Sequence, residues 1–241
     1  MKLSVVVPAY NEAALITDTL ESIQQAAAPL IADGLGLELL VVDNACTDET
    51  ARLAAAAGAV VVEEPQRQIA RARNAGAAAA TGDWLVFVDA DSRPTPGLFK
   101  EVEECIRAGN VAAGGSTVRM RTGTLGGALA VNLWNVISRH VGWAAGSFIF
   151  CRADAFRDVG GFDLEYYIAE ELVLSNALKA WARRHNLGFT ILSNYPLETS
   201  GRKTELYSAR EIASIFWGML RHGRRYFRDP TLCYPWYDGR R

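Results

Sequence analysis

The sequence predicts an α/β fold: one domain whose mostly parallel sheet is flanked by helices. Three observations predict it. Strand and helix patterns alternate through the first 110 residues, polar or turn-forming segments follow the predicted strands, and neither a repeat nor a linker divides the 241 residues. We expect residues 1–110 to form a regular half, 111–205 a less regular half, and 206–241 a C-terminal helix and tail.

The first half contains four predicted strands, each followed by a predicted helix. Short β-branched or apolar runs predict strands at residues 3–7, 38–42, 59–63 and 84–88. Apolar residues at helical spacing predict helices at 12–28, 48–57 and 67–80, and Pro96 suits the first turn of a helix that ends near residue 108. We expect the helix at 12–28 to stop before Pro29, because proline cannot donate a backbone hydrogen bond.

The second half alternates less regularly. Its predicted strands are 111–121, 147–151 and 189–192, and its predicted helices are 125–137, 153–159 and 168–184. A further apolar stripe within 207–228 is followed by arginines and aromatic residues. We favour packing of this stripe on the domain, because such a stripe is first of all a core signal. The alternative is peripheral contact of this C-terminal helix with an anionic membrane surface.

Composition and charge exclude several classes of protein. The net charge of −2 and the pI of about 6.0 do not suit a protein that holds nucleic acid through its phosphates, so we expect no nucleic-acid partner. The four cysteines lie far apart, with no nearby histidine, which argues against zinc and favours a reducing compartment. We also find neither a signal-peptide pattern nor an apolar run long enough for a membrane span. We expect a cytoplasmic protein, either soluble or peripheral at the inner face of the membrane.

The sharpest chemical signal is Asp89-Ala90-Asp91, directly after the predicted strand at 84–88. In sheets of this kind, ligands bind beyond the carboxyl ends of the strands. Two carboxylates at such a strand end can hold Mg²⁺ or Mn²⁺, and a cation there would neutralise a departing diphosphate. The alternative is that the aspartates only form a turn or cap the next helix. We favour the metal because the triplet follows the fourth apolar strand.

Four segments, in this order along the chain, resemble glycosyltransferase family 2: VVVPAYNE, VVDNACTDET, RQIARARNAGAAAATGDWLVFVDADSRP and VGGFDLEYYIAEEL. The resemblance implies the A-type glycosyltransferase fold, with 1–110 as the nucleotide-sugar-binding half and 111–205 as the acceptor-side half. It also implies an inverting, divalent-metal-dependent enzyme. Such an enzyme transfers a sugar from a nucleoside-diphosphate donor to a hydroxyl of a glycan, lipid or small molecule. The sequence identifies neither this acceptor nor the oligomeric state.

The resemblance assigns the donor-binding positions. Residues that match them are Pro8, Ala9, Tyr10, Glu12, Asp43, Asn44, Asp89, Ala90 and Asp91. Asn44 stands where many members have a second aspartate, and its side-chain carbonyl can still accept a hydrogen bond from a base. Asp89 and Asp91 are the expected metal ligands.

Arginines in the third segment provide further donor contacts. Arg67, Arg71 and Asn74 are expected on one helix face, where the arginine forks could bind diphosphate oxygens, whereas Arg73 is expected to point elsewhere. The alternative is a solvated basic face. Gly76 indicates close packing of this helix on the sheet. Arg202, in a polar loop, resembles a basic residue that closes over the diphosphate in some relatives, with an ordinary surface loop as the equal alternative.

The acceptor side supplies the proton-transfer candidates. The family usually has Glu-Asp where this chain has Glu170-Glu171, so the resemblance assigns the base to Glu171, with Glu170 as the alternative. Two glutamates in the first turn of a helix are also favoured by its dipole alone. Gly146, Ser147 and Asp163 resemble acceptor-side elements.

Two other functions stay open at this point. A nucleotidyltransferase also combines an α/β sheet, a metal and a nucleotide, although its usual glycine-rich N-terminal loop is replaced here by PAYNE. A catalytically inactive relative that only binds nucleotide or carbohydrate is kept open by Asn44 and Glu171, the two departures from the family pattern.

Overall fold

The computed structural model of the protein describes residues 1–121, 125–200, 217 and 221–233. Within this part of the chain, eight strands form one sheet in the order β3-β2-β1-β4-β7-β6-β8-β5. The strands are β1 (Lys2–Ala9), β2 (Gly36–Asp43), β3 (Val60–Glu63), β4 (Trp84–Val88), β5 (Ser92–Arg93), β6 (Val111–Met120), β7 (Phe148–Arg152) and β8 (Gly188–Thr199). Strands β7 and β5 pair antiparallel with their neighbours, and all other pairs are parallel. The prediction of a mostly parallel α/β sheet is therefore confirmed.

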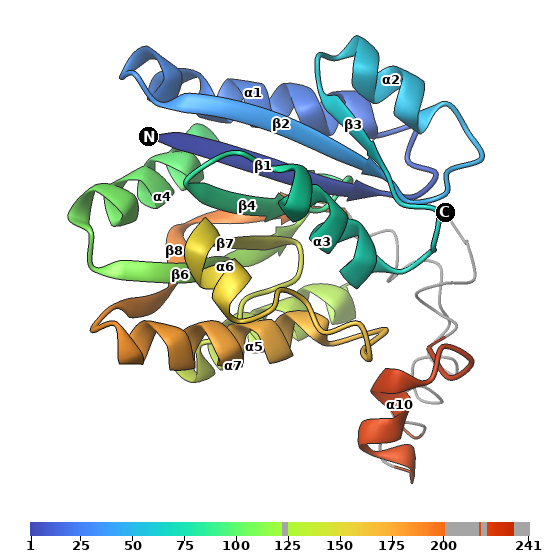
Figure 1. Ribbon diagram of the computed structural model, residues 1–241. Coiled ribbons are helices and arrows are strands. Elements are labelled where there is room, and N and C mark those ends of the chain that lie inside the picture. The colour runs from blue at the N-terminus through green and yellow to red at the C-terminus, as the bar shows by residue number, and fades with distance from the viewer. Residues whose placement is uncertain (122–124, 201–216, 218–220, 234–241) are drawn as a thin grey trace.

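Helices cover both faces of this sheet (Figure 1). They are α1 (Ile16–Ala32), α2 (Thr50–Ala56), α3 (Ile69–Ala79), α4 (Pro96–Ala108), α5 (Leu125–Val141), α6 (Ala153–Asp158), α7 (Glu170–Arg184) and the short α10 (Arg224–Arg228). Alternate residues of β1 point to opposite faces, so Val5 and Val7 pack in one core layer and Val6 in the other. The first layer receives α1, α2, α4 and α5, and the second receives α3, α6 and α7.

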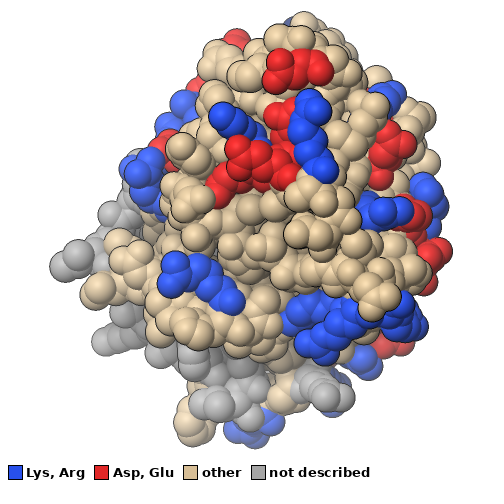
Figure 2. Space-filling model, turned by 90° about the vertical axis from the view of Figure 1, so that its left-hand side faces the viewer, with Lys and Arg blue, Asp and Glu red and all other residues tan. Residues whose placement is uncertain are grey.

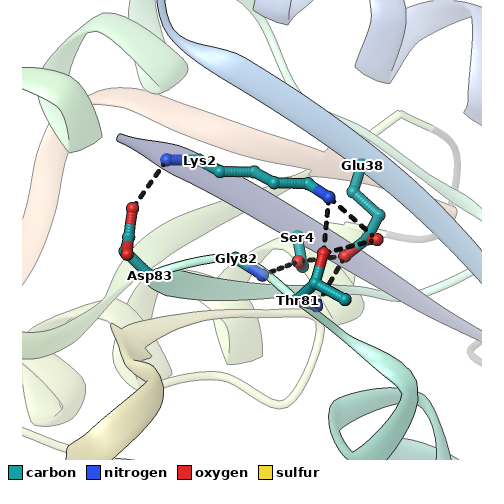
Figure 3. A network of polar contacts seen from close by, with 6 residues as sticks. All are labelled: Lys2, Ser4, Glu38, Thr81, Gly82 and Asp83. Carbon is teal, nitrogen blue, oxygen red and sulfur yellow. Dashed lines mark hydrogen bonds and ion pairs between the residues drawn. The ribbon is translucent and has the colours of Figure 1, made fainter.

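A polar network ties the amino ends of the central strands together (Figure 3). The Glu38 carboxylate accepts hydrogen bonds from Lys2 Nζ at 3.0 Å, from Ser4 Oγ at 2.5 Å and from the Thr81 backbone N–H at 2.8 Å. Burial by itself would raise the pKa of Glu38, but these donors outweigh it and lower the pKa to about 2. The network therefore holds β1, β2 and the entry to β4 together at the end of the sheet where these strands begin.

The strands and helices match the predicted ones closely, with three corrections. Helix α1 begins at Ile16 rather than residue 12, and it continues through Pro29 to Ala32, because Leu30 beyond the proline is buried in the core. Strand β8 is longer than predicted, and the two-residue β5 was not predicted. In the tail, residues 207–216 and 218–220 lie outside the described residues. The part that follows buries Tyr226 and Cys233 against Ile168.

Candidate active site

The loops after β1 and β2 are bonded to each other at the carboxyl end of the sheet. The backbone N–H of Asn44 donates to Ala9 O at 2.9 Å, and Thr47 N donates to the Asn11 side-chain carbonyl at 2.7 Å. The Cys46 thiol lies between the loops: it donates to Ala9 O at 3.4 Å and accepts from Asn11 N. Burial raises the pKa of Cys46 to about 11, so the thiol stays protonated and keeps this donation. These bonds fix the first donor-binding loop predicted from the sequence.

Asp43 and Asn44 have different tasks in this loop pair. Asp43 Oδ1 accepts the backbone N–H of Cys46 at 2.8 Å, which shapes the turn. The Asn44 amide donates to Glu64 O and Gln66 O, at 2.9 and 2.8 Å, and accepts from Gln68 N at 3.1 Å. A carboxylate could not donate these two bonds, which explains the departure from the commoner aspartate. The Asn44 amide therefore braces residues 64–68, and contact of its carbonyl with a base stays a prediction.

Tyr10 and Arg67 meet between the first and third segments. The Arg67 guanidinium lies 3.7 Å from the centroid of the Tyr10 ring, a stacking contact across two loops. Glu12 is buried, and its backbone carbonyl accepts from Leu15 N and Ile16 N at the start of α1. Pro8 is the penultimate residue of β1. The sequence-predicted residues of the first loop therefore gather at one edge of the sheet.

Arg73 is the centre of the site, a role that the sequence did not predict for it. Its side chain is buried, and its Nη1 donates to Glu170 Oε1 at 2.7 Å. Its Nη2 donates to Asp89 Oδ1 at 3.0 Å and to Gly146 O at 2.7 Å. The guanidinium thus joins strand β4, the segment before β7 and helix α7. Helix α3 begins at Ile69, two residues later than predicted, and its inward face carries Ala70, Arg73 and Gly76.

The carboxylates around Arg73 explain why a buried guanidinium is tolerated. Burial alone would lower the pKa of Arg73, but the charges of Asp89, Glu170 and Glu171 outweigh it and raise that pKa. Arg73 therefore stays charged. Arg71, two residues earlier, is half-buried on α3.

Glu170 and Glu171 begin helix α7 after Ala169, whose left-handed φ of 63° turns the chain into the helix. Glu170 is buried against Arg73, whereas Glu171 is half-buried. Burial, followed by the neighbouring charge of Glu170, raises the pKa of Glu171 to about 8, against the opposing effect of Arg73. A Cβ atom placed on Gly146 would lie 3.5 Å from Glu171 Cδ, so this carboxyl packs against Gly146. Glu171 thus combines a high proton affinity with a place beside Gly146, one of the predicted acceptor-side residues.

The loop at 160–167, which contains the predicted acceptor residue Asp163, is held by Asn74 of α3 and by Gln68, the residue before α3. Asn74 makes two bonds with the Phe162 backbone, each 2.9 Å long. Gln68 donates to Leu164 O and Tyr166 O at 2.9 and 3.0 Å. Asp163 Oδ1 accepts Glu165 N at 2.9 Å within this braced turn. Asn74 therefore positions the 160–167 loop, and the role of Gln68 in holding it was not predicted.

The Asp89-Ala90-Asp91 triplet lies directly beyond β4, as predicted. The backbone N–H of Asp89 donates to Ser147 O at 3.3 Å, and Ala90 O accepts the Thr19 hydroxyl at 2.8 Å. The Asp89 carboxylate pairs with Arg73, while Asp91 is half-buried. Among the described residues, no group of three or more His, Cys, Asp or Glu side chains could hold a metal. Arg202 lies outside the described residues.

Comparison with known proteins adds a family match. The model of the family described as glycosyl transferase family 2 matches residues 4–157. The glucosyl-3-phosphoglycerate synthase of Mycobacterium tuberculosis (strain H37Rv) is 40% identical over 97 residues. This match covers 37% of the chain but only 28% of that relative, so the chain spans less than a third of the relative's length.

Two solved structures share the fold. The fragment 1–349 of S. aureus TarS in complex with UDP has a TM-score of 0.65 and 19% identity, covering 98% of this chain and 68% of that one. The mannosyltransferase PcManGT from Pyrobaculum calidifontis in complex with GDP-Man and Mn²⁺ also has a TM-score of 0.65, with 20% identity and coverages of 96% and 64%. At these identities the likeness concerns the fold.

Proposed function

The chain belongs to glycosyl transferase family 2, and on this basis we propose that it transfers a sugar from a nucleoside-diphosphate donor to a hydroxyl acceptor, with inversion at the anomeric carbon. One observation carries the proposal: Arg73 joins Asp89, at the donor-side strand end, to Glu170, beside the candidate base Glu171. The donor and acceptor elements of the sequence pattern are thus held together by one buried guanidinium.

We place the nucleotide over the first two loops and the diphosphate near Asp89 and Asp91. Support comes from the positions of two residues: Tyr10 follows β1, and Asp43 ends β2. Ligands of such sheets bind at these carboxyl ends of the strands. Relatives of the same fold have been solved with UDP and with GDP-Man. Arg67 and Arg71 are further candidates for the diphosphate, as the sequence predicted.

A divalent cation fits this site. The described residues supply the two aspartates of the triplet and no larger group, which suits Mg²⁺ or Mn²⁺, since these ions accept one or two carboxylates plus phosphate and water oxygens. Asp91 would be the principal ligand, because the Asp89 carboxylate is already paired with Arg73. When bound, the cation would neutralise negative charge on the leaving diphosphate.

Glu171 would act as the general base. As the acceptor oxygen attacks the anomeric carbon, its proton moves to the Glu171 carboxylate and the C–O bond to the diphosphate breaks. The electron pair of that bond leaves with the diphosphate, so a single in-line displacement inverts the anomeric carbon. Glu170 pairs with Arg73 and keeps the start of α7 in place.

The test combines donor binding with turnover. Thermal shifts with UDP- and GDP-sugars, each with and without Mg²⁺ or Mn²⁺, identify the donor, because a ligand that binds the native state stabilises it. Release of nucleoside diphosphate then measures slow hydrolysis, in which water replaces the acceptor. We expect Asp91→Asn to remove the metal-dependent thermal shift, and Glu171→Gln to keep the shift but abolish turnover. Glu104→Gln, on the exposed side of α4, is the matched control.

Three outcomes would contradict the proposal. Normal turnover of Glu171→Gln removes this residue as the base. Release of pyrophosphate from a nucleoside triphosphate identifies a nucleotidyltransferase instead. Donor binding without hydrolysis or transfer to any hydroxyl acceptor tested indicates a relative that only binds its ligand.

A further inference from the structure

Helix α5 carries an exposed apolar stripe that the active site does not use. The side chains on it that stand in solvent are Leu129, Leu133, Val136, Ile137 and Val141. Leu129 and Leu133 are 63% and 62% exposed. Because their spacings are four, three, one and four residues, these positions share one side of the helix. We call this set the α5 stripe.

The opposite side of α5 is firmly attached to the domain. Val131 and Trp134 pack against the core, and the Asn135 amide makes two bonds with the Val118 backbone, at 3.0 and 2.8 Å. Ser138 is buried and donates to Trp143 O at 2.6 Å. The orientation of the helix is therefore fixed. The α5 stripe faces solvent although the helix is firmly packed on its other side.

The chain segment that contains α5 carries no acidic residue. The sequence contains no aspartate or glutamate from Cys105 to Ala153, while Arg139 and His140 in the last turn of α5 and Arg121, four residues before the helix, are exposed. Figure 2 faces the end of the molecule where β1 begins. Basic side chains predominate in the lower part of this view, at the level of α5 and α7 in Figure 1. An apolar stripe bordered by positive charge is complementary to an anionic surface with an apolar interior.

The size of the stripe favours a lipid surface over a second copy. Five partly exposed side chains amount to a few hundred Å², whereas a stable protein interface buries about 800 Å² on each partner. No helix in the described part of the chain has the length and apolarity to cross a bilayer. The stripe would therefore lie on a membrane rather than span it.

We propose that the α5 stripe seats the protein on the surface of an anionic lipid bilayer. Gly146, whose carbonyl binds Arg73, follows Val141 by only five residues, so the seated helix would hold the candidate active site close to the lipid headgroups. This proposal goes beyond the transferase reaction and does not depend on it. It also differs from membrane contact through the C-terminal helix.

The experiment is co-sedimentation of the full chain with vesicles. We expect binding to vesicles that contain phosphatidylglycerol and much weaker binding to pure phosphatidylcholine. The double variant Leu129→Gln/Leu133→Gln should weaken binding by roughly tenfold or more, because apolar area leaves the interface. Arg139→Gln should weaken it mainly at low salt. The matched control is Ile31→Gln/Val60→Gln, which alters two exposed apolar residues on other elements and should bind normally.

Further measurements distinguish loss of lipid binding from unfolding and from loss of donor binding. Circular dichroism and thermal unfolding show that each variant is folded, and donor-induced thermal shifts without vesicles test the transferase proposal independently. Absence of vesicle binding by the unmodified chain, or equal loss in the control variant, would overturn the lipid proposal. A dimer in light scattering that the Leu129→Gln/Leu133→Gln variant dissolves would assign the stripe to a second copy instead.

Discussion

Removing the Arg73 charge should destabilise the fold because it leaves carboxylates buried without a counter-charge. Arg73 Nη1 lies 2.7 Å from Glu170 Oε1, and the two side chains are 2% and 4% exposed. Breaking a buried ion pair by deleting one partner costs about 3–5 kcal/mol. We expect Arg73→Met to lose stability of this order. We expect Arg73→Lys to lose less, because an ammonium keeps the charge but cannot form the same fork.

The loss of stability in Arg73→Met should depend on pH and on the presence of Glu170. Burial raises the pKa of Glu170, and without Arg73 that pKa rises further, so the carboxyl is protonated at low pH and its burial then costs little. The stability deficit of Arg73→Met should therefore grow as pH rises through this elevated pKa. Adding Glu170→Gln should recover part of it, because a neutral amide replaces the unpaired charge.

The assay is urea denaturation at pH 5.5 and pH 8 for both single variants and the double variant, which together form a double-mutant cycle. The matched control is Arg52→Met, which removes an exposed ion pair with Glu49 and should change stability very little. If Arg73→Met costs no more than this control, or if Glu170→Gln gives no recovery, the argument for a buried charge centre is wrong.

Four further predictions concern Glu171, Glu38 and Gly76. Hydrolysis of the donor should rise with pH towards about 8, because Glu171 must lose its proton to act as a base, and Glu171→Gln should be inactive at every pH in this range. Because the folded-state pKa of Glu171 is raised, it costs stability as pH rises from about 4.5 to 8, so Glu171→Gln should unfold at a higher temperature than the unmodified chain at pH 8.5. Glu38→Gln should lose about 1–2 kcal/mol at pH 7, and its deficit in urea titrations should vanish as pH falls from 4.5 towards 2, since the folded-state pKa is lowered to about 2. Gly76→Ala should lose about 1–3 kcal/mol in urea denaturation, because a Cβ there would lie 2.3 Å from Val6 Cγ1 and 2.8 Å from Val42 Cγ2, and Ala78→Ser on the exposed side of α3 serves as its control.

The sequence predicted the elements whose signals are local. Strand β4 and helix α4 have the predicted bounds, because a five-residue apolar run and a proline at the first helical turn are visible without knowledge of the fold. Gly76 was correctly read as a packing residue. Helix α1 passes Pro29 because burial of Leu30 outweighs the lost backbone bond, which the local pattern does not reveal.

Features that depend on distant partners were missed. Strand β5 exists because Ser92 and Arg93 pair with Thr199 and Glu198, more than 100 residues away in sequence. The bonds between the Asn44 side chain and the backbone of residues 64–68 were not predicted. Arg73 was set aside because it lies off the helix face that Arg67, Arg71 and Asn74 share. Its burial follows from Asp89, Gly146 and Glu170, which lie 16, 73 and 97 residues along the chain.

The charges in the candidate site also account for its two proposed requirements, a cation and a base. Asp89, Asp91, Glu170 and Glu171 are four acidic groups, and Arg73 supplies one buried positive charge that is already engaged by Asp89 and Glu170. A diphosphate would add further negative charge beside Asp91, so its approach requires positive charge that Arg73 does not have left to give. Arg67, which stacks on Tyr10, and Arg71 are candidates for part of that charge, and we propose that a divalent cation at Asp91 supplies the rest. Burial, followed by the charge of the neighbouring Glu170, raises the pKa of Glu171, and a high proton affinity is the property that a base requires when it takes the proton of an acceptor hydroxyl.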